Sequence, residues 1–89
     1  MLSFEEHRKD FVMGLIDKAK KLPEGTIFLI DDIITSESEI EYFNSLRLTD
    51  RGNIGNMFRN YSIGTCIRYI GSTSDKRAQY KIKKANTNC

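Results

Sequence analysis

The stretch "LTDRGNIGNMFRNYSIG", residues 48–64, decides how this chain folds. Its large apolar side chains recur every three or four residues, at Ile54, Met57, Phe58 and Tyr61. That spacing predicts a helix over residues 49–60 with these side chains facing inward. The outer face carries glycine and asparagine, although each glycine costs a helix roughly 1 kcal/mol relative to alanine. Such a face is typical of a helix that another backbone or a ligand approaches closely.

The segment before this helix predicts further helices and a short strand. A first helix is predicted to begin at the capping box of Ser3 and Glu6 and to end at "LPEG", residues 22–25. The β-branched and aromatic run "TIFLI", residues 26–30, is typical of a brief strand. Residues 31–46 favour helix, either as one bent helix or as two pieces.

The end of the chain predicts a β-hairpin. The runs "TCIRYI" (65–70) and "RAQYKIKK" (77–84) read as strands, and the turn-rich segment "GSTSDK" (71–76) joins them. A hairpin alone is marginally stable in water, so this one must lie against the helices, and the strand at 26–30 is placed to pair with its edge. Residues 85–89 are predicted to be a frayed tail.

Together these elements predict an α+β fold with a three-helix core, a C-terminal β-hairpin and a short extra strand. The 89 residues fit a single domain, 1–89. No apolar run approaches the roughly 18 residues that a membrane span needs. The N-terminus also lacks the apolar segment of a secretory signal, so we expect a cytoplasmic protein without membrane contact.

The sequence contains no familiar metal or cofactor motif. One histidine, His7, accompanies Cys66 and Cys89, and the two cysteines are far from C-x-x-C spacing. We expect reduced thiols in a cytoplasmic chain, with a disulfide as the alternative. No phosphate-binding loop, dinucleotide fingerprint or nucleophile–base pair is present either. We therefore expect no cofactor, no metal and no enzymatic activity.

The net charge of +2 conceals a strong asymmetry between the two parts of the chain. Residues 1–50 contain six Lys/Arg and eleven Asp/Glu, a net charge of −5. Residues 51–89 contain eight Lys/Arg and one acid, Asp75, a net charge of +7. A basic second part indicates a surface that binds polyanions.

The order of these elements resembles that of the winged-helix domain, over almost the whole chain from Ser3 to Lys84. The segments "LPEGTIF", "GNMF" and "YKI" also resemble motifs of small uncharacterised bacterial and phage winged-helix proteins, LPEGT-x-F, G-x-x-F and Y-x-I. The resemblance implies a winged helix-turn-helix fold, with residues 49–60 as the recognition helix and the hairpin as the wing. Many winged helices bind double-stranded DNA, and others bind only protein.

The exposed polar residues of this helix and hairpin are the candidate DNA-binding residues. In the major groove asparagine pairs with adenine and arginine with guanine, while lysines on a hairpin can contact phosphates. The candidates are Arg51, Asn53, Asn56, Arg59 and Asn60 on the helix and Arg68, Lys76, Arg77, Lys81 and Lys83 on the hairpin. In the alternative reading, the glycines pack tightly against another helix and the polar side chains are only solvated. Tyrosines can also stack on bases, but Tyr61 and Tyr80 are predicted to lie in the core.

Other functions remain open at this stage. The acidic residues Glu37, Glu39 and Glu41 could imitate DNA or meet a basic partner. The chain would then be a protein-binding module, such as a phage-encoded inhibitor of a host nucleoprotein or defence nuclease. A homodimer through the first helix is a further alternative, in which Phe11 and Leu15, together with Phe4, would be partly exposed in the monomer.

Overall fold

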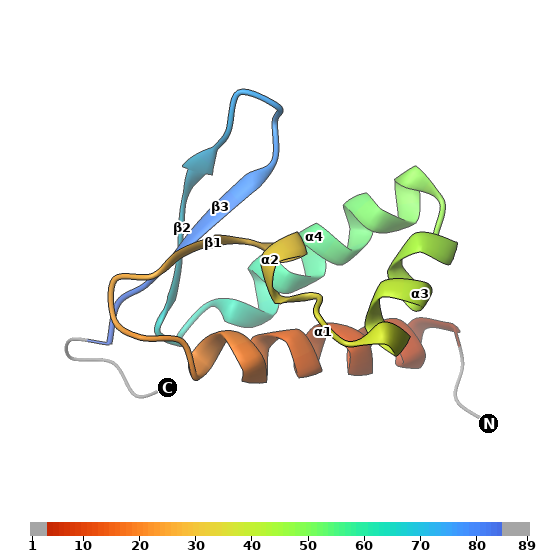
Figure 1. Ribbon diagram of the computed structural model, residues 1–89, viewed down its shortest axis with the longest axis horizontal. Helices are drawn as coiled ribbons and strands as arrows, with labels where there is room; N and C mark the ends of the chain where they lie inside the picture. The colour runs from red at the N-terminus through yellow and green to blue at the C-terminus, as the bar shows by residue number, and fades with distance from the viewer. Residues whose placement is uncertain (1–3, 85–89) are drawn as a thin grey trace.

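The computed structural model describes residues 4–84, and side chains from His7 onward. This part of the chain is a small α+β domain with four helices and a three-stranded antiparallel sheet (Figure 1). In chain order the elements are α1 (Phe4–Lys20), β1 (Ile27–Leu29), α2 (Ile30–Ile33), α3 (Glu37–Ser45), α4 (Leu48–Ser62), β2 (Ile67–Ser72) and β3 (Ala78–Ile82). The predicted cap at Ser3 and the predicted frayed tail, 85–89, lie outside the described residues.

Helix α4 packs against α1 along the stripe that the opening sequence predicted. Ile54 and Phe58 are fully buried, and Met57 packs against the core. The prediction for Tyr61 is wrong, because 41% of this residue is exposed whereas Ser62 is only 3% exposed. The buried row thus advances strictly by four residues, from 54 to 58 to 62, which turns position 61 toward solvent.

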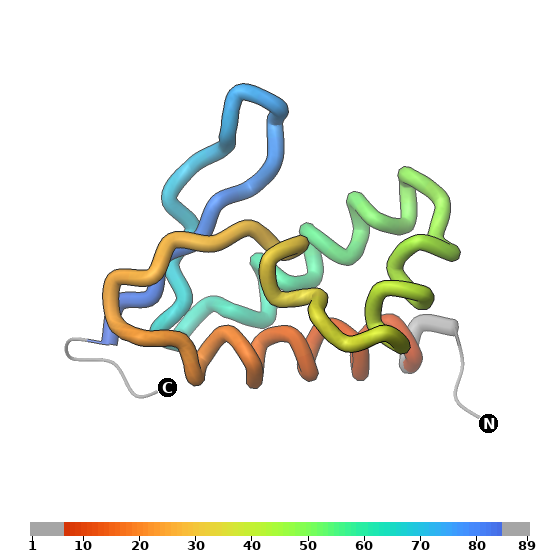
Figure 2. The backbone as a smooth tube through the Cα atoms, viewed as in Figure 1, coloured from red at the N-terminus to blue at the C-terminus, as the bar shows by residue number. Residues whose placement is uncertain are grey.

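The sheet has the order β1-β3-β2, so the last strand in sequence is the central one. The predicted hairpin and the predicted pairing of the "TIF" strand are therefore both confirmed. Figure 2 shows how the chain returns to place β3 beside β1, although about fifty residues separate them in sequence, for example Phe28 opposite Tyr80. The buried ring of Tyr80 meets Phe28 at 5.7 Å and Phe58 at 4.9 Å between centroids, which joins the sheet to α4.

The region 31–46 forms two separate helices rather than one bent helix. The break is stabilised by Glu39, whose carboxylate accepts the backbone N–H of Ser36 at 3.0 Å while the Ser36 hydroxyl accepts the N–H of Glu39 at 3.2 Å. This reciprocal pair is a capping box, which begins α3.

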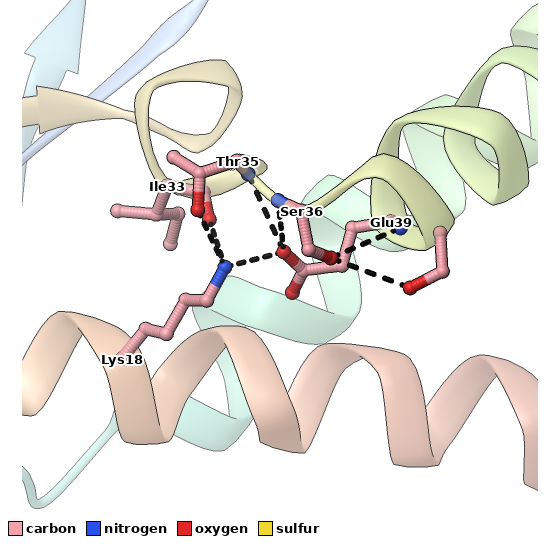
Figure 3. Close-up of polar contacts among 6 residues, drawn as sticks. Lys18, Ile33, Thr35, Ser36 and Glu39 are labelled. Atoms are coloured by element: carbon pink, nitrogen blue, oxygen red, sulfur yellow. Dashed lines mark hydrogen bonds and ion pairs between the residues drawn. The ribbon is translucent and has the colours of Figure 1, made fainter.

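Lys18 of α1 bonds to residues on both sides of the break between α2 and α3 (Figure 3). Its ammonium donates to the carbonyl of Ile33 at 3.0 Å, to the hydroxyl of Thr35 at 2.9 Å and to the carboxylate of Glu39. Burial by itself raises the pKa of Glu39, but the hydrogen bonds from Lys18, Ser36 and Thr35 outweigh it and lower that pKa from 4.5 to about 2.

The lowered pKa of Glu39 predicts a pH-dependent contribution to stability. This contribution is complete above pH 4.5 and is lost as the pH falls toward 2, because the unfolded chain then binds a proton that the folded chain resists. Glu39→Gln should lower the free energy of unfolding at neutral pH by about 1–2 kcal/mol and remove that acid-dependent portion. Urea denaturation across acidic pH measures this, with the exposed Glu37→Gln as the matched control. If the free energy of unfolding depends on pH in the same way for both variants, the prediction is contradicted.

Leu15 is fully buried within the monomer, and Phe11 packs against the rings of Tyr42 and Phe43, so these two residues are not the exposed ones that a homodimer through the first helix was expected to use. The side chain of Phe4 lies outside the described ones, and the homodimer itself stays a prediction. The expectation about the cysteines needs correction. Cys66 is buried and disulfide-bonded, whereas the sequence predicted a reduced thiol; Cys89 lies outside the described residues. That prediction used spacing and compartment, which carry no information on how closely two sulfur atoms approach in the fold. Within residues 4–84 no helix is long and apolar enough to cross a membrane.

Candidate functional site

A groove of about 420 Å³ lies between α4 and the β2–β3 hairpin. The hairpin projects from the sheet, and α4 runs away from the base of the hairpin in another direction, as the ribbon in Figure 1 shows. Arg51, Gly52, Gly55, Asn56 and Arg59 of α4 line one side, and Tyr69 of β2 with Lys76 and Arg77 near the hairpin turn line the other. The buried residues Ile54 and Tyr80 form part of its floor. The two elements with the most basic candidates therefore face each other.

Two of the arginines in this groove donate hydrogen bonds to other elements of the protein. Arg51 donates to the backbone carbonyls of Phe43 at 3.2 Å and Asn44 at 3.1 Å, so it bonds the end of α3 to the start of α4. Arg77 donates to the carboxylate of Asp31 in α2 at 2.8 Å, which links the hairpin to the helices. Arg51 thus has two donors, and Arg77 one, bonded to other parts of the chain.

Arg59 and Lys76 differ from these two arginines. Both are exposed, and among the described residues neither makes an ion pair. The guanidinium carbon of Arg59 lies 4.0 Å from the centroid of the Tyr69 ring, a cation–π contact between α4 and β2. These cations therefore keep their donors for a ligand in the groove.

Lys76 has an uncommon backbone conformation. Its φ is +66°, the left-handed region in which the hairpin turn would favour glycine or asparagine. The turn is closed by the N–H of Lys76 donating to the carbonyl of Thr73 at 2.9 Å and by the N–H of Thr73 donating to the carbonyl of Arg77 at 2.8 Å. This conformation costs about 1 kcal/mol relative to glycine and places the Lys76 side chain at the hairpin turn, where it lines the groove.

The glycines of α4 do not serve tight packing, which the sequence had left as an alternative. A Cβ atom added at Gly52 or at Gly55 would meet nothing within 4 Å. Both glycines instead line the groove. Their missing side chains leave room for the backbone of α4 to be approached from outside, as the opening pattern predicted.

The hydroxyl of Tyr80 is the buried polar atom of the groove floor. Among the described residues it has no hydrogen-bond partner. Burial raises the pKa of Tyr80, and the nearby positive charge of Arg59 opposes this by lowering it. The hydroxyl therefore stays protonated beside the Arg59 side chain.

The structure does not bring every predicted residue to the groove. Asn53 and Asn60 are exposed on α4 beside the groove lining. Lys81 lies opposite Ile27 and Arg68 in the sheet, and Lys83 follows it on the same face by strand alternation. Because Tyr80 points the other way, these basic side chains lie on the outer face of the sheet, and Arg68 bends back to the carbonyl of Thr65.

The acidic residues near α3 are mostly used inside the molecule. Glu39 accepts from Lys18, and Asp31 accepts from Arg77. Asp32 accepts the backbone N–H of Leu29 at 2.9 Å. Glu37 and Glu41 remain exposed. Among the described side chains, residues 7–84, no three His, Cys, Asp or Glu are gathered as a metal site requires.

Of three comparisons with known proteins, the one with solved structures finds a protein of similar fold. No protein-family model and no curated protein matches this sequence. Among solved structures, the chain is similar to one described as "SCCmec type IV LP1413 - nucleic acids binding protein", with a TM-score of 0.61. The two are 16% identical, and the alignment covers 93% of this chain and 94% of the other. At this identity the likeness concerns the fold.

Proposed function

We propose that this chain is a winged-helix protein that binds double-stranded DNA through α4 and the β2–β3 hairpin. In this proposal α3 and α4, joined by Leu46 and Arg47, form the helix-turn-helix, and the hairpin is the wing. The similar solved structure is described as a nucleic acids binding protein, which supports the same class of ligand here. A regulator or accessory protein of a bacterial or phage genome is the role that fits such a domain, with binding and no catalysis.

The observation that carries the proposal is the convergence of Arg59 and Lys76 on one groove from separate elements. Both lack an acidic partner among the described residues, while the other basic residues of the groove are held by the protein. Arg59 and Lys76 thus present positive charge to one groove from two elements, and such charge favours the binding of a polyanion such as duplex DNA. The glycines and Asn56 on the helix side let α4 enter a major groove closely and offer a side chain that bonds to adenine.

The docking that follows places α4 in the major groove and the hairpin along the adjacent backbone or minor groove. Asn53, Asn56 and Asn60 then face base edges, and Lys76 at the hairpin turn reaches a phosphate. The outer sheet face with Lys81 and Lys83 points away from this duplex. It contributes through its long-range field and not through contacts.

Fluorescence anisotropy of labelled duplexes tests the proposal. We expect micromolar binding of random-sequence duplex that weakens steeply as salt is raised, because neutralised phosphates release counterions. An acidic protein of similar size, added as a competitor in place of DNA, should displace little of the bound duplex. Absence of binding at low salt would overturn the proposal.

Lys76→Gly should separate stability from binding. We expect the free energy of unfolding to rise by about 0.5–1 kcal/mol, because glycine adopts positive φ without steric cost. Duplex affinity should fall, and the slope of log affinity against log salt should decrease by about one. Lys21→Gly removes the same charge at an exposed position remote from the groove and serves as the control. A gain of stability with unchanged affinity would show that Lys76 is only a turn residue.

The protein-binding alternative receives less support from the described residues. An acidic face that imitates DNA needs several free carboxylates, and Glu39, Asp31 and Asp32 are each bound to groups of the chain itself. Glu37 and Glu41 are left to present negative charge on α3. The basic groove is therefore the better supported binding surface, because cations from two elements line one cavity.

A further inference from the structure

We propose that Tyr69 on β2 is a positioning residue that holds Arg59 in the orientation required to bind the edge of guanine. The inference rests on the proposed binding of double-stranded DNA and adds to it a base preference and the residue that creates this preference. The sequence pattern alone had assigned no specific role to Tyr69.

The geometry begins with the contact between the two side chains. The guanidinium carbon of Arg59 lies 4.0 Å from the centroid of the Tyr69 ring, within stacking distance. Arg59 is exposed and carries no ion pair among the described residues, so this ring is the group that fixes its direction. An arginine without such support would sample many rotamers and would lose that freedom on binding.

Tyr69 is itself fixed from two sides. Its hydroxyl lies 3.1 Å from the hydroxyl oxygen of Ser72, which anchors the far end of the ring to the same strand. Its ring meets the ring of Tyr80 edge-on, at 5.8 Å between centroids, and Tyr80 is fully buried against Phe58. A continuous line of packed rings therefore runs from the core of the molecule to Arg59.

The strand pairing places Tyr69 at the point where the hairpin leaves the regular sheet. Tyr69 is paired with Tyr80, and the register then shifts so that Gly71 is opposite Gln79. This bulge, with φ of +129° at Gly71, bends the strand just beyond the Tyr69 position. The Tyr69 ring lies on the groove side of the strand, where it contacts Arg59 of α4.

A fixed guanidinium favours a base over a phosphate as its ligand. A phosphate needs only a nearby positive charge, which the flexible Lys76 supplies equally well. Guanine presents two acceptors, O6 and N7, to the planar fork of an arginine, and both bonds form only if the fork is correctly oriented. Arg59 also lies one helical turn after Asn56, so the two side chains project from the same side of α4.

The test begins with selection of preferred duplexes by the wild-type protein from a pool with a randomised central segment. The recovered duplex and its variants with each guanine replaced are then titrated against the wild type, Arg59→Ala, Arg59→Lys, Tyr69→Leu and Tyr69→Phe. Tyr61→Leu is the matched control, because Tyr61 is exposed on α4 and does not line the groove. Thermal unfolding of each variant separates loss of fold from loss of recognition.

We expect Arg59→Ala and Tyr69→Leu each to reduce discrimination for one guanine by about tenfold, the size of one good bidentate contact. The double variant should lose no more than either single variant, because both changes remove the same contact. Tyr69→Phe should retain the preference, since its ring still supports the guanidinium, whereas Arg59→Lys should lose it.

The inference is overturned if Tyr69→Leu lowers affinity equally for all duplexes, or if it leaves the guanine preference intact while Arg59→Ala removes it. Failure of the wild type to bind any duplex at low salt would be a different result, because it would overturn the proposed function itself.

Discussion

Replacing Phe58 with alanine is expected to remove a large part of the free energy of unfolding of this domain. Phe58 is fully buried, and its ring meets Phe28 at 6.3 Å and Tyr80 at 4.9 Å, edge-on in both cases. Truncating a buried phenylalanine costs about 3–5 kcal/mol, while a domain of this size has only about 4–13 kcal/mol of stability in total. The loss is large because this ring lies where α4, β1 and β3 meet.

Circular dichroism during urea denaturation measures the effect directly. Tyr61→Ala is the control, since it removes an aromatic ring of similar size from an exposed position of the same helix. We expect this control to stay within about 1 kcal/mol of the wild type, as is usual for surface substitutions. A similar loss for both variants would contradict this, because it would mean that burial of the Phe58 ring in the cluster does not decide the stability of α4.

The second large effect is expected for reversal of the two uncommitted charges of the groove. The double variant Arg59→Glu with Lys76→Glu replaces attraction by repulsion on both sides of the groove, and we expect duplex affinity to fall by about a hundredfold or more. Both residues are exposed, so the fold should persist. Anisotropy at fixed salt, with thermal unfolding of the same samples, gives both quantities.

A charge-matched control separates local contact from overall charge. Lys9→Glu with Lys21→Glu changes the net charge equally, and both lysines are exposed and absent from the groove lining. This control should lose affinity only through the long-range field, by several fold, and less at higher salt. Equal losses of duplex affinity for the two double variants would mean that the groove residues act only through the overall charge of the protein.

The sequence predicted the elements well because their patterns are local. The row of Ile54 and Phe58 gave α4, and the alternation ending in Tyr80 and Ile82 gave the central strand, since each pattern reflects one buried face. The position of Tyr61 was less predictable, because positions 61 and 62 border the same face and only the packing of α4 on α1 chooses between them.

The sequence predicted several residues of the candidate site, but it did not predict which of them bond to other parts of the protein. Arg51 and Arg59 have the same charge and lie on the same helix, yet Arg51 bonds to carbonyls of α3 whereas Arg59 stacks on Tyr69. These partners come from elements distant in sequence, so no local pattern can report them. The positive φ of Lys76 depends similarly on the geometry of the whole hairpin.

The central position of β3 also governs when the protein can fold during synthesis. Residues 78–82 pair with β1 on one side and β2 on the other, and they supply Tyr80 and Ile82 to the core. A nascent chain that has reached only α4 therefore holds an edge-exposed β1 and an incomplete core. We expect the core to close only once residue 82 is available, because Tyr80 and Ile82 belong to it. The groove, which Tyr80 also lines, is then completed in the same step.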